Sequence, residues 1–201
     1  MEAGKINFAE TDRDYYYSGK TPKFLTFGEK KYISIQGKGQ PGGEEFQKSI
    51  QLLYTVAYQA KYAGKKLGKD FTVSRLECLW WADEGKNFET TPIDQWNWKL
   101  LIRIPNFVST EDIGRAKSAV TETKGLSGSE KVQIDSLSEG RCVQALHLGP
   151  YDKVGETYDR IIKFIEENGL KHNGPYHEIY MSNPDRTSPE KLKTIIRQPV
   201  K

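Results

Sequence analysis

Cysteine and histidine are scarce in this chain. It has only two cysteines, Cys78 and Cys142, and three histidines among 201 residues. Two cysteines that lie far apart in strand-like segments do not build a disulfide framework, and no group of Cys and His residues has the spacing of a metal site. We therefore expect both cysteines to be reduced packing residues. We expect neither a metal nor another cofactor.

Other absences exclude further classes of protein. The glycine-rich segment 37–43, GKGQPGG, lacks the Lys-Ser/Thr ending of a phosphate-binding loop, and there is no nucleophile elbow. The 30 basic and 27 acidic residues leave a net charge of +3, without the basic stripe typical of nucleic-acid binding. No apolar run reaches the length of a membrane span, and the N-terminal segment lacks the layout of a signal peptide. We expect a soluble, cytoplasmic protein that contacts neither nucleic acid nor membrane. The oligomeric state is left open.

The segment from Pro175 to Pro199 predicts a β-hairpin with a long loop. Tyr176, Glu178 and Tyr180 alternate with the residues between them, so a strand would place all three on one face. Asn183-Pro184-Asp185 is typical of a turn, after which the strand pattern resumes. One face of this hairpin therefore carries a carboxyl group between two tyrosines.

Glu178 is the first candidate site residue. Glutamate is disfavoured inside strands, and the flanking tyrosines would partly desolvate it. A desolvated carboxylate favours a bound cation or a proton, which is typical of functional sites. The alternative is a solvated side chain, or one paired with Arg197 or Lys193 on the adjacent strand. Tyr176 and Tyr180 are either packing residues or an aromatic wall that holds a cation.

A second copy of the hairpin lies upstream. Residues 99–105 match residues 193–199 as K-x-[LI]-I-R-x-P, and each run follows a strand with a central glutamate, Glu77 or Glu178. Both halves read as strand, Gly/Pro turn, helix, strand, strand, which predicts an internal duplication. We expect an α+β fold of two pseudo-symmetric βαββ modules in one compact domain. The expected parts are an N-terminal arm (1–22), a first module (23–105), an inserted helix and connector (106–140) and a second module (141–201).

Further ligand-binding candidates are less distinctive. Glu77 shares a predicted face with Trp81 and with Arg75, which is its expected partner. Trp81, Trp96 and Trp98 could stack on a planar ligand, although tryptophans at this spacing are more often core residues. We expect one or two of the three to line a ligand site. His147 precedes a Gly-Pro turn, where a histidine with satisfied hydrogen bonds is the expected reading.

The run GPY at 149–151 before a helix, HEIYMSNP at 177–184 and PEKLKTIIRQPV at 189–200 resemble the GyrI-like family. This family is also known as the effector-binding domain of AraC-type and MerR-type regulators. The resemblance covers nearly the whole chain. It implies two βαββ modules whose antiparallel sheets surround a central cleft for small, often aromatic or cationic, molecules, with Glu178 in that cleft. Residues 1–22 are too short to supply the DNA-binding domain usually attached in the family.

The resemblance leaves three functions open. The first is a stand-alone protein that binds or sequesters xenobiotics and so protects against them. The second is an enzyme, because some stand-alone members hydrolyse cyclopropane-bearing DNA-alkylating compounds. Glu178 would then be the general base, and Tyr180 or Tyr176 the hydrogen-bond donor to the oxyanion. The third is a module that inhibits a protein target.

Overall fold

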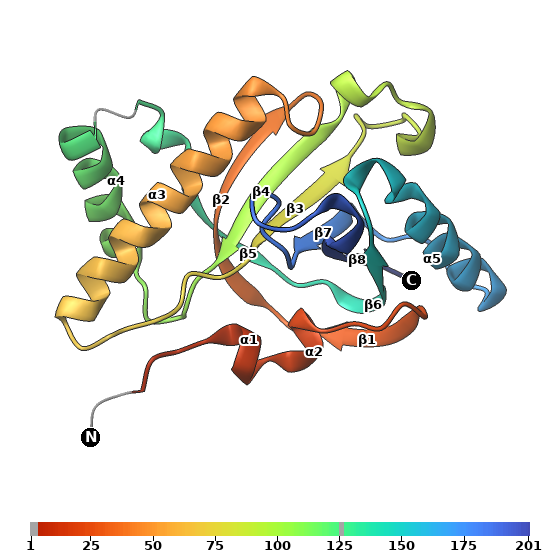
Figure 1. Cartoon of the computed structure of the whole chain (residues 1–201), viewed down its shortest axis with the longest axis horizontal. Coiled ribbons are helices and arrows are strands. Elements are labelled where there is room, and N and C mark those ends of the chain that lie inside the picture. Colours follow the sequence, from red (N-terminus) through yellow and green to blue (C-terminus); the bar gives the residue numbers. More distant parts are fainter. Residues whose placement is uncertain (1–3, 125–126) are drawn as a thin grey trace.

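A computed structural model describes residues 4–124 and 127–201, and it contains one curled, antiparallel sheet (Figure 1). The order of its eight strands is β1-β6-β8-β7-β3-β4-β2-β5. The strands are β1 (Lys23–Phe27), β2 (Lys30–Lys38), β3 (Leu76–Trp81), β4 (Asn97–Arg103), β5 (Gln133–Leu137), β6 (Gly140–Leu148), β7 (Tyr176–Tyr180) and β8 (Lys193–Pro199).

Two helices cover one face of the sheet. The first, α3 (Glu44–Lys66), packs on β2 and β4, and α5 (Gly155–Glu167) packs on β6 and β8. The central strands β3 and β7 lie between these two helix-covered parts (Figure 1). An apolar stripe with helical spacing explains why α3 lies on the sheet, since its buried residues recur every three or four positions. They include Phe46, Leu53, Val56, Ala57 and Ala60.

The expected inserted helix is present as α4 (Thr110–Lys124), which packs against α3. Its start follows the capping-box pattern. The backbone N–H of Asp112 donates to Ser109 Oγ, and the backbone N–H of Ser109 donates to Asp112 Oδ2. Residues 125 and 126 of the predicted connector lie outside the described residues, as do residues 1–3 of the arm.

The N-terminal arm packs through two of its tyrosines. It contains two short helices, α1 (Phe8–Thr11) and α2 (Arg13–Tyr16), before β1 begins. Tyr15 and Tyr16 are buried, whereas Tyr17 is 64% exposed. The arm therefore inserts two of its three consecutive tyrosines into the core. None of the described helices is both long and apolar enough to cross a bilayer.

The expectation of separate sheets is wrong, because the strands form a single sheet. The inner strands β3 and β7 pair directly, with Cys78 opposite Glu178 and Leu79 opposite His177. An unpaired inner edge would expose a row of backbone N–H and C=O groups, which pairing satisfies. On one side of this seam the order is β6-β8-β7, and on the other it is β3-β4-β2. The mixed helix and strand class is confirmed.

Candidate functional site

Glu178 lies at the seam between the two helix-covered parts of the sheet. On β7 it faces Cys78 of β3 on one side and Ile196 of β8 on the other. Both neighbours belong to the face covered by helices, since Cys78 packs in the core under α3 and Ile196 in the core under α5. Glu178 is 8% exposed. A carboxyl group is thus held in a largely apolar surrounding, where it needs specific partners.

Two tyrosine hydroxyls supply these partners. Tyr158 of α5 donates to Glu178 Oε1 over 2.6 Å, and Tyr180 donates to Oε2 over 2.7 Å. Burial, followed by the nearby charge of Glu178, raises the pKa of both tyrosines well above 10. They therefore remain protonated donors at neutral pH, in short hydrogen bonds of the charge-assisted kind. The alternative pairing of Glu178 with Arg197 does not occur, because Arg197 binds Glu139 on the opposite face.

A chain of aromatic side chains, which we call the aromatic belt, runs from this site to α3. Tyr158 contacts Tyr176 with ring centroids 4.8 Å apart, and Tyr176 contacts Phe88 at 5.1 Å. The contacts continue from Phe88 to Trp96 at 4.2 Å and from Trp96 to Trp80 at 5.9 Å. At the other end of the belt, the ring centroid of Phe46 on α3 lies 5.4 Å from that of Trp80 and 5.3 Å from that of Trp98. The members of the belt are Tyr158, Tyr176, Phe88, Trp96, Trp80, Phe46 and Trp98.

The structure separates the three tryptophans named as ligand candidates. Trp96 belongs to the belt and is partly exposed, and its indole N–H donates to the carbonyl of Thr91. Trp98 is 1% exposed and packs against Gly37, where an added Cβ would lie 2.3 Å from the ring. Trp81 packs with residues of the opposite face, because side chains alternate along β3. The tryptophan of β3 that lies beside Tyr176 is Trp80.

Glu77 also lies on the opposite face from Glu178. Its carboxyl group is completely buried and accepts hydrogen bonds from Tyr15 (2.6 Å), Tyr16 (3.1 Å) and His177 (3.0 Å). The expected partner Arg75 is exposed instead. Glu77 therefore joins the arm to β3 and β7, and it does not share a site with Glu178.

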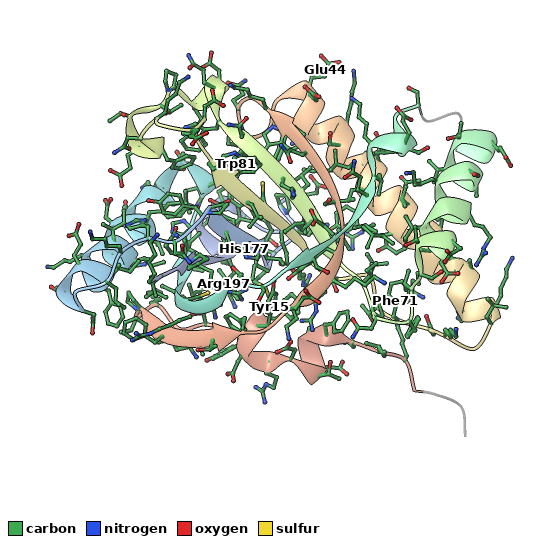
Figure 2. The ribbon with its side chains drawn as sticks, turned by 180° about the vertical axis from the view of Figure 1, so that it is seen from behind. Tyr15, Glu44, Phe71, Trp81, His177 and Arg197 are labelled. Atoms are coloured by element: carbon green, nitrogen blue, oxygen red, sulfur yellow. The ribbon has the colours of Figure 1, made fainter. Side chains whose placement is uncertain are left out.

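Glu77 belongs to a larger buried network. His177 also binds Glu139 over 2.8 Å, and Glu139 binds the guanidinium of Arg197. Arg197 donates to Gln144 Oε1 and to the carbonyl of Tyr15 in the arm. Figure 2 shows Tyr15, His177 and Arg197 close together, with Trp81 farther along the sheet. Charged groups from β3, β7, β8 and the turn before β6 thus meet in the interior, next to the tyrosines of the arm.

The pKa values of His177 and Glu139 show which groups of this network are charged. Burial alone would lower the pKa of His177, but the charges and hydrogen bonds of Glu139 and Glu77 raise it to about 9. Burial alone would raise the pKa of Glu139, but His177 and Arg197 lower it to about 2. At neutral pH, His177 is therefore a cation and Glu139 an anion.

His147 has satisfied hydrogen bonds, as expected. Its Nδ1 lies 3.0 Å from Thr157 Oγ1, and its Nε2 lies 3.1 Å from the carbonyl of Pro150. A carbonyl can only accept, so Nε2 is the donor in the second contact. Both ring nitrogens are occupied, which leaves His147 as a link between β6 and the start of α5. No group of three or more His, Cys, Asp or Glu side chains within 4–124 and 127–201 is arranged to hold a metal ion.

Three site residues escaped the sequence-based prediction. Tyr158 and Phe88 were not among the candidates, and of the two consecutive tryptophans Trp81 was named and Trp80 was not. The strand register across β3 and β7 brings Trp80 beside Tyr176, and alternation alone does not reveal that register. A tyrosine on the inner stripe of the second helix was the available signal for Tyr158, since a buried hydroxyl needs a partner.

Comparison with known proteins gives a consistent family. The model of the family described as "GyrI-like small molecule binding domain" matches residues 20–201. An uncharacterized conserved protein from Listeria innocua is 33% identical with a TM-score of 0.90, covering 98% of this chain and 100% of its own. A hydrolase from Listeria innocua is 34% identical with a TM-score of 0.85 and the same coverage. The comparison with curated proteins gives no match.

A more distant structure, the C-terminal domain of EcmrR, is 14% identical with a TM-score of 0.59, over 90% of this chain and 97% of its own. At this identity the likeness shows a shared fold alone. The family match covers most of the chain, and the Listeria innocua proteins match it over nearly its full length. By sequence and by fold, this chain belongs to the GyrI-like family of small-molecule-binding domains.

Proposed function

We propose that this protein binds an aromatic or cationic small molecule at Glu178 and thereby protects against toxic compounds. One observation carries the proposal, namely that both oxygens of a carboxyl group with 8% exposure accept tyrosine hydrogen bonds beside the aromatic belt. Each carboxylate oxygen can accept a second hydrogen bond. The site therefore keeps acceptor capacity for a ligand after the tyrosines are bound.

A cationic ligand suits these surroundings for two physical reasons. A carboxylate removed from water has lost hydration, and a cation placed against it restores favourable electrostatics. The faces of tyrosine and tryptophan rings add attraction for the same cation when it lies within about 6 Å of the ring centre. The belt also offers area for a flat, uncharged ring.

Hydrolysis is the second candidate, favoured by the similarity over nearly the full chain to a protein described as a hydrolase. For a cyclopropane conjugated to a carbonyl, water adds to the ring carbon while one carbon–carbon bond breaks. The electron pair of that bond moves to the carbonyl oxygen. Glu178 takes the proton from water and, once protonated, no longer needs the hydrogen bond from Tyr180. The hydroxyl of Tyr180, or that of Tyr176 on the same face of β7, then donates to the oxyanion. Protonation of that oxygen by the acid formed on Glu178 restores the carboxylate.

A time course with a duocarmycin-type cyclopropanoid tests both candidates, with intact and water-added products separated by mass-resolved chromatography. Glu178→Gln is compared with wild type and with Glu190→Gln, an exposed carboxyl on a surface turn. Hydrolysis predicts turnover that falls about 10²- to 10⁴-fold in Glu178→Gln alone. Sequestration predicts stoichiometric protection, with weaker binding of cations and unchanged binding of neutral ligands in the same variant. If Glu178→Gln changes neither turnover nor binding, the proposal fails and a protein-inhibiting module becomes the better account.

The two-module design is part of the same proposal. Read outward from the seam, the strand orders are β7-β8-β6 on one side and β3-β4-β2 on the other. In each set the strand before the helix is outermost and the first strand after the helix lies at the seam, and each set is covered by one helix. This supports a pseudo-two-fold relation between residues 23–105 and 141–201. Glu178 then lies next to the axis, where the helices of the two modules face the shared seam.

A further inference from the structure

The segment between β3 and β4 is a loop that carries one residue of the aromatic belt. Residues 82–96 contain only two short 3₁₀ turns, Phe88–Thr90 and Ile93–Gln95. In Figure 1 this segment is the yellow-green loop beyond the ends of β3 and β4, next to α5. Tyr158, Tyr176, Trp80, Phe46 and Trp98 are carried by strands or long helices, and Trp96 lies directly before β4. Phe88 is the belt residue that a loop carries.

Both ends of this loop are fastened. At one end, Asp83 accepts hydrogen bonds from Lys38, Lys86 and Asn97. At the other end, the carbonyl of Thr91 accepts from Trp96 Nε1, and the hydroxyl of Thr91 donates to the carbonyl of Asn87. The backbone hydrogen bonds of residues 84–90 are local to the loop, so this stretch can move without breaking a hydrogen bond of β3 or β4.

Within this stretch, Phe88 is the side chain that packs inward. Its neighbours at 84–87, 89 and 90 are exposed, whereas Phe88 is half-buried. Its ring lies 4.2 Å from Trp96 with the planes tilted by 32°, and 5.1 Å from Tyr176 with a tilt of 39°. These separations are those of two packed aromatic rings. Phe88 thus occupies a ring-sized position that contacts both Trp96 and Tyr176.

The position of this ring matters for the site. Tyr176 contacts Tyr158, whose hydroxyl binds Glu178, and Tyr176 and Glu178 share one face of β7. Glu178 itself is 8% exposed, so a ligand larger than a few atoms reaches it only if a side chain withdraws. Among the belt residues, withdrawal costs least at Phe88, because its loop leaves no sheet hydrogen bonds behind.

We infer that the Phe88 ring occupies the position of a planar aromatic ring of the ligand. On binding, the ligand ring displaces Phe88 and stacks on Trp96 and Tyr176. This inference rests on the proposed function and adds to it a specificity-determining residue. The association constant of wild type is then the intrinsic association constant multiplied by the fraction of molecules in which Phe88 is withdrawn. The preferred ligand carries one flat ring, which replaces Phe88, next to a group that faces Glu178.

The test uses N-methylacridinium, a flat fluorescent cation, with stopped-flow and equilibrium titration of wild type, Phe88→Ala and Phe164→Ala. Phe164 is a matched control, a half-buried phenylalanine of α5 that packs against Phe24 of the edge strand β1. We expect Phe88→Ala to bind about tenfold faster and tighter, by removal of the competing ring. Phe164→Ala should match wild type. Unchanged or weaker binding by Phe88→Ala would make Phe88 a fixed wall and overturn the inference.

A label at position 88 separates this inference from the proposed function. With 4-fluorophenylalanine in place of Phe88, the fluorine resonance should move toward that of an exposed ring as the probe is added. Probe binding without any change in that resonance refutes the displacement and leaves the proposed function standing. If the probe binds neither wild type nor Phe88→Ala, the proposed function and the inference fail together.

Discussion

Raising the pH from 6.5 to 9 is expected to lower the free energy of unfolding through His177. This side chain is completely buried between Glu77 and Glu139, which raise its pKa from 6.5 to about 9 against the opposing effect of burial. A group whose pKa is higher in the folded state stabilises the fold below its unfolded pKa, and this stabilisation is lost as pH rises through the folded pKa. The interval from 6.5 to 9 corresponds to about 3 kcal/mol.

The same ion pair acts at acidic pH. The pKa of Glu139 is lowered from 4.5 to about 2, so its contribution is present above pH 4.5 and is lost as the pH falls toward 2. Because Glu139 and His177 bind each other, the two contributions share one interaction and are not added. This ion pair therefore favours maximal stability between about pH 4.5 and 6.5.

Urea unfolding at several pH values between 6 and 9 measures this effect. Wild type and His172→Gln, a control histidine outside the network, should lose stability with the same slope. His177→Gln should be less stable at pH 6 by about 3–5 kcal/mol, as expected for a broken buried pair, and should show a much smaller slope. NMR titration should give the His177 ring a pKa near 9. A wild-type stability that is flat from pH 6.5 to 9, or an unchanged slope in His177→Gln, would refute the reasoning.

Three further predictions concern stability and can be measured by urea unfolding at pH 7. Gly37→Ala should cost about 1–3 kcal/mol, because the new Cβ would meet the Trp98 ring at 2.3 Å. Tyr16→Phe should cost about 1–3 kcal/mol by leaving Glu77 with one donor fewer, whereas Tyr17→Phe, at an exposed position, should be neutral. Ser109→Ala should cost about 1 kcal/mol through loss of the α4 cap, and Ser109→Thr should not.

Strand alternation correctly predicted which residues of β7 share a face. Tyr176, Glu178 and Tyr180 do share one face of β7, because a period of two residues is a property of any strand. The partner from α5 and the ring from the loop depend on tertiary packing, so Tyr158 and Phe88 were not predicted. Whether the two halves arose by duplication stays a prediction, although their strand orders agree.

The buried network was beyond the sequence patterns for a different reason. Its members Glu77, Glu139, His177 and Arg197 come from distant parts of the chain and have no fixed spacing. Each alone suggests a surface residue, since charged side chains are rarely buried unless paired. Only the strand order β6-β8-β7-β3 brings them together. The same order explains why Glu77, which looked like a counterpart of Glu178, has structural partners.

His177 and Glu178 show how the two faces of β7 depend on each other. They are consecutive residues, so one faces the buried network and the other faces the aromatic belt. A shift of β7 by one residue against β3 would turn the carboxyl group of Glu178 toward Glu77 and move His177 under the helices. That arrangement would bury like charges together and leave Tyr158 of α5 without its acceptor. The network behind the strand therefore specifies the register that places Glu178 between Tyr158 and Tyr180, and Arg197 and the arm hold that register from the opposite face.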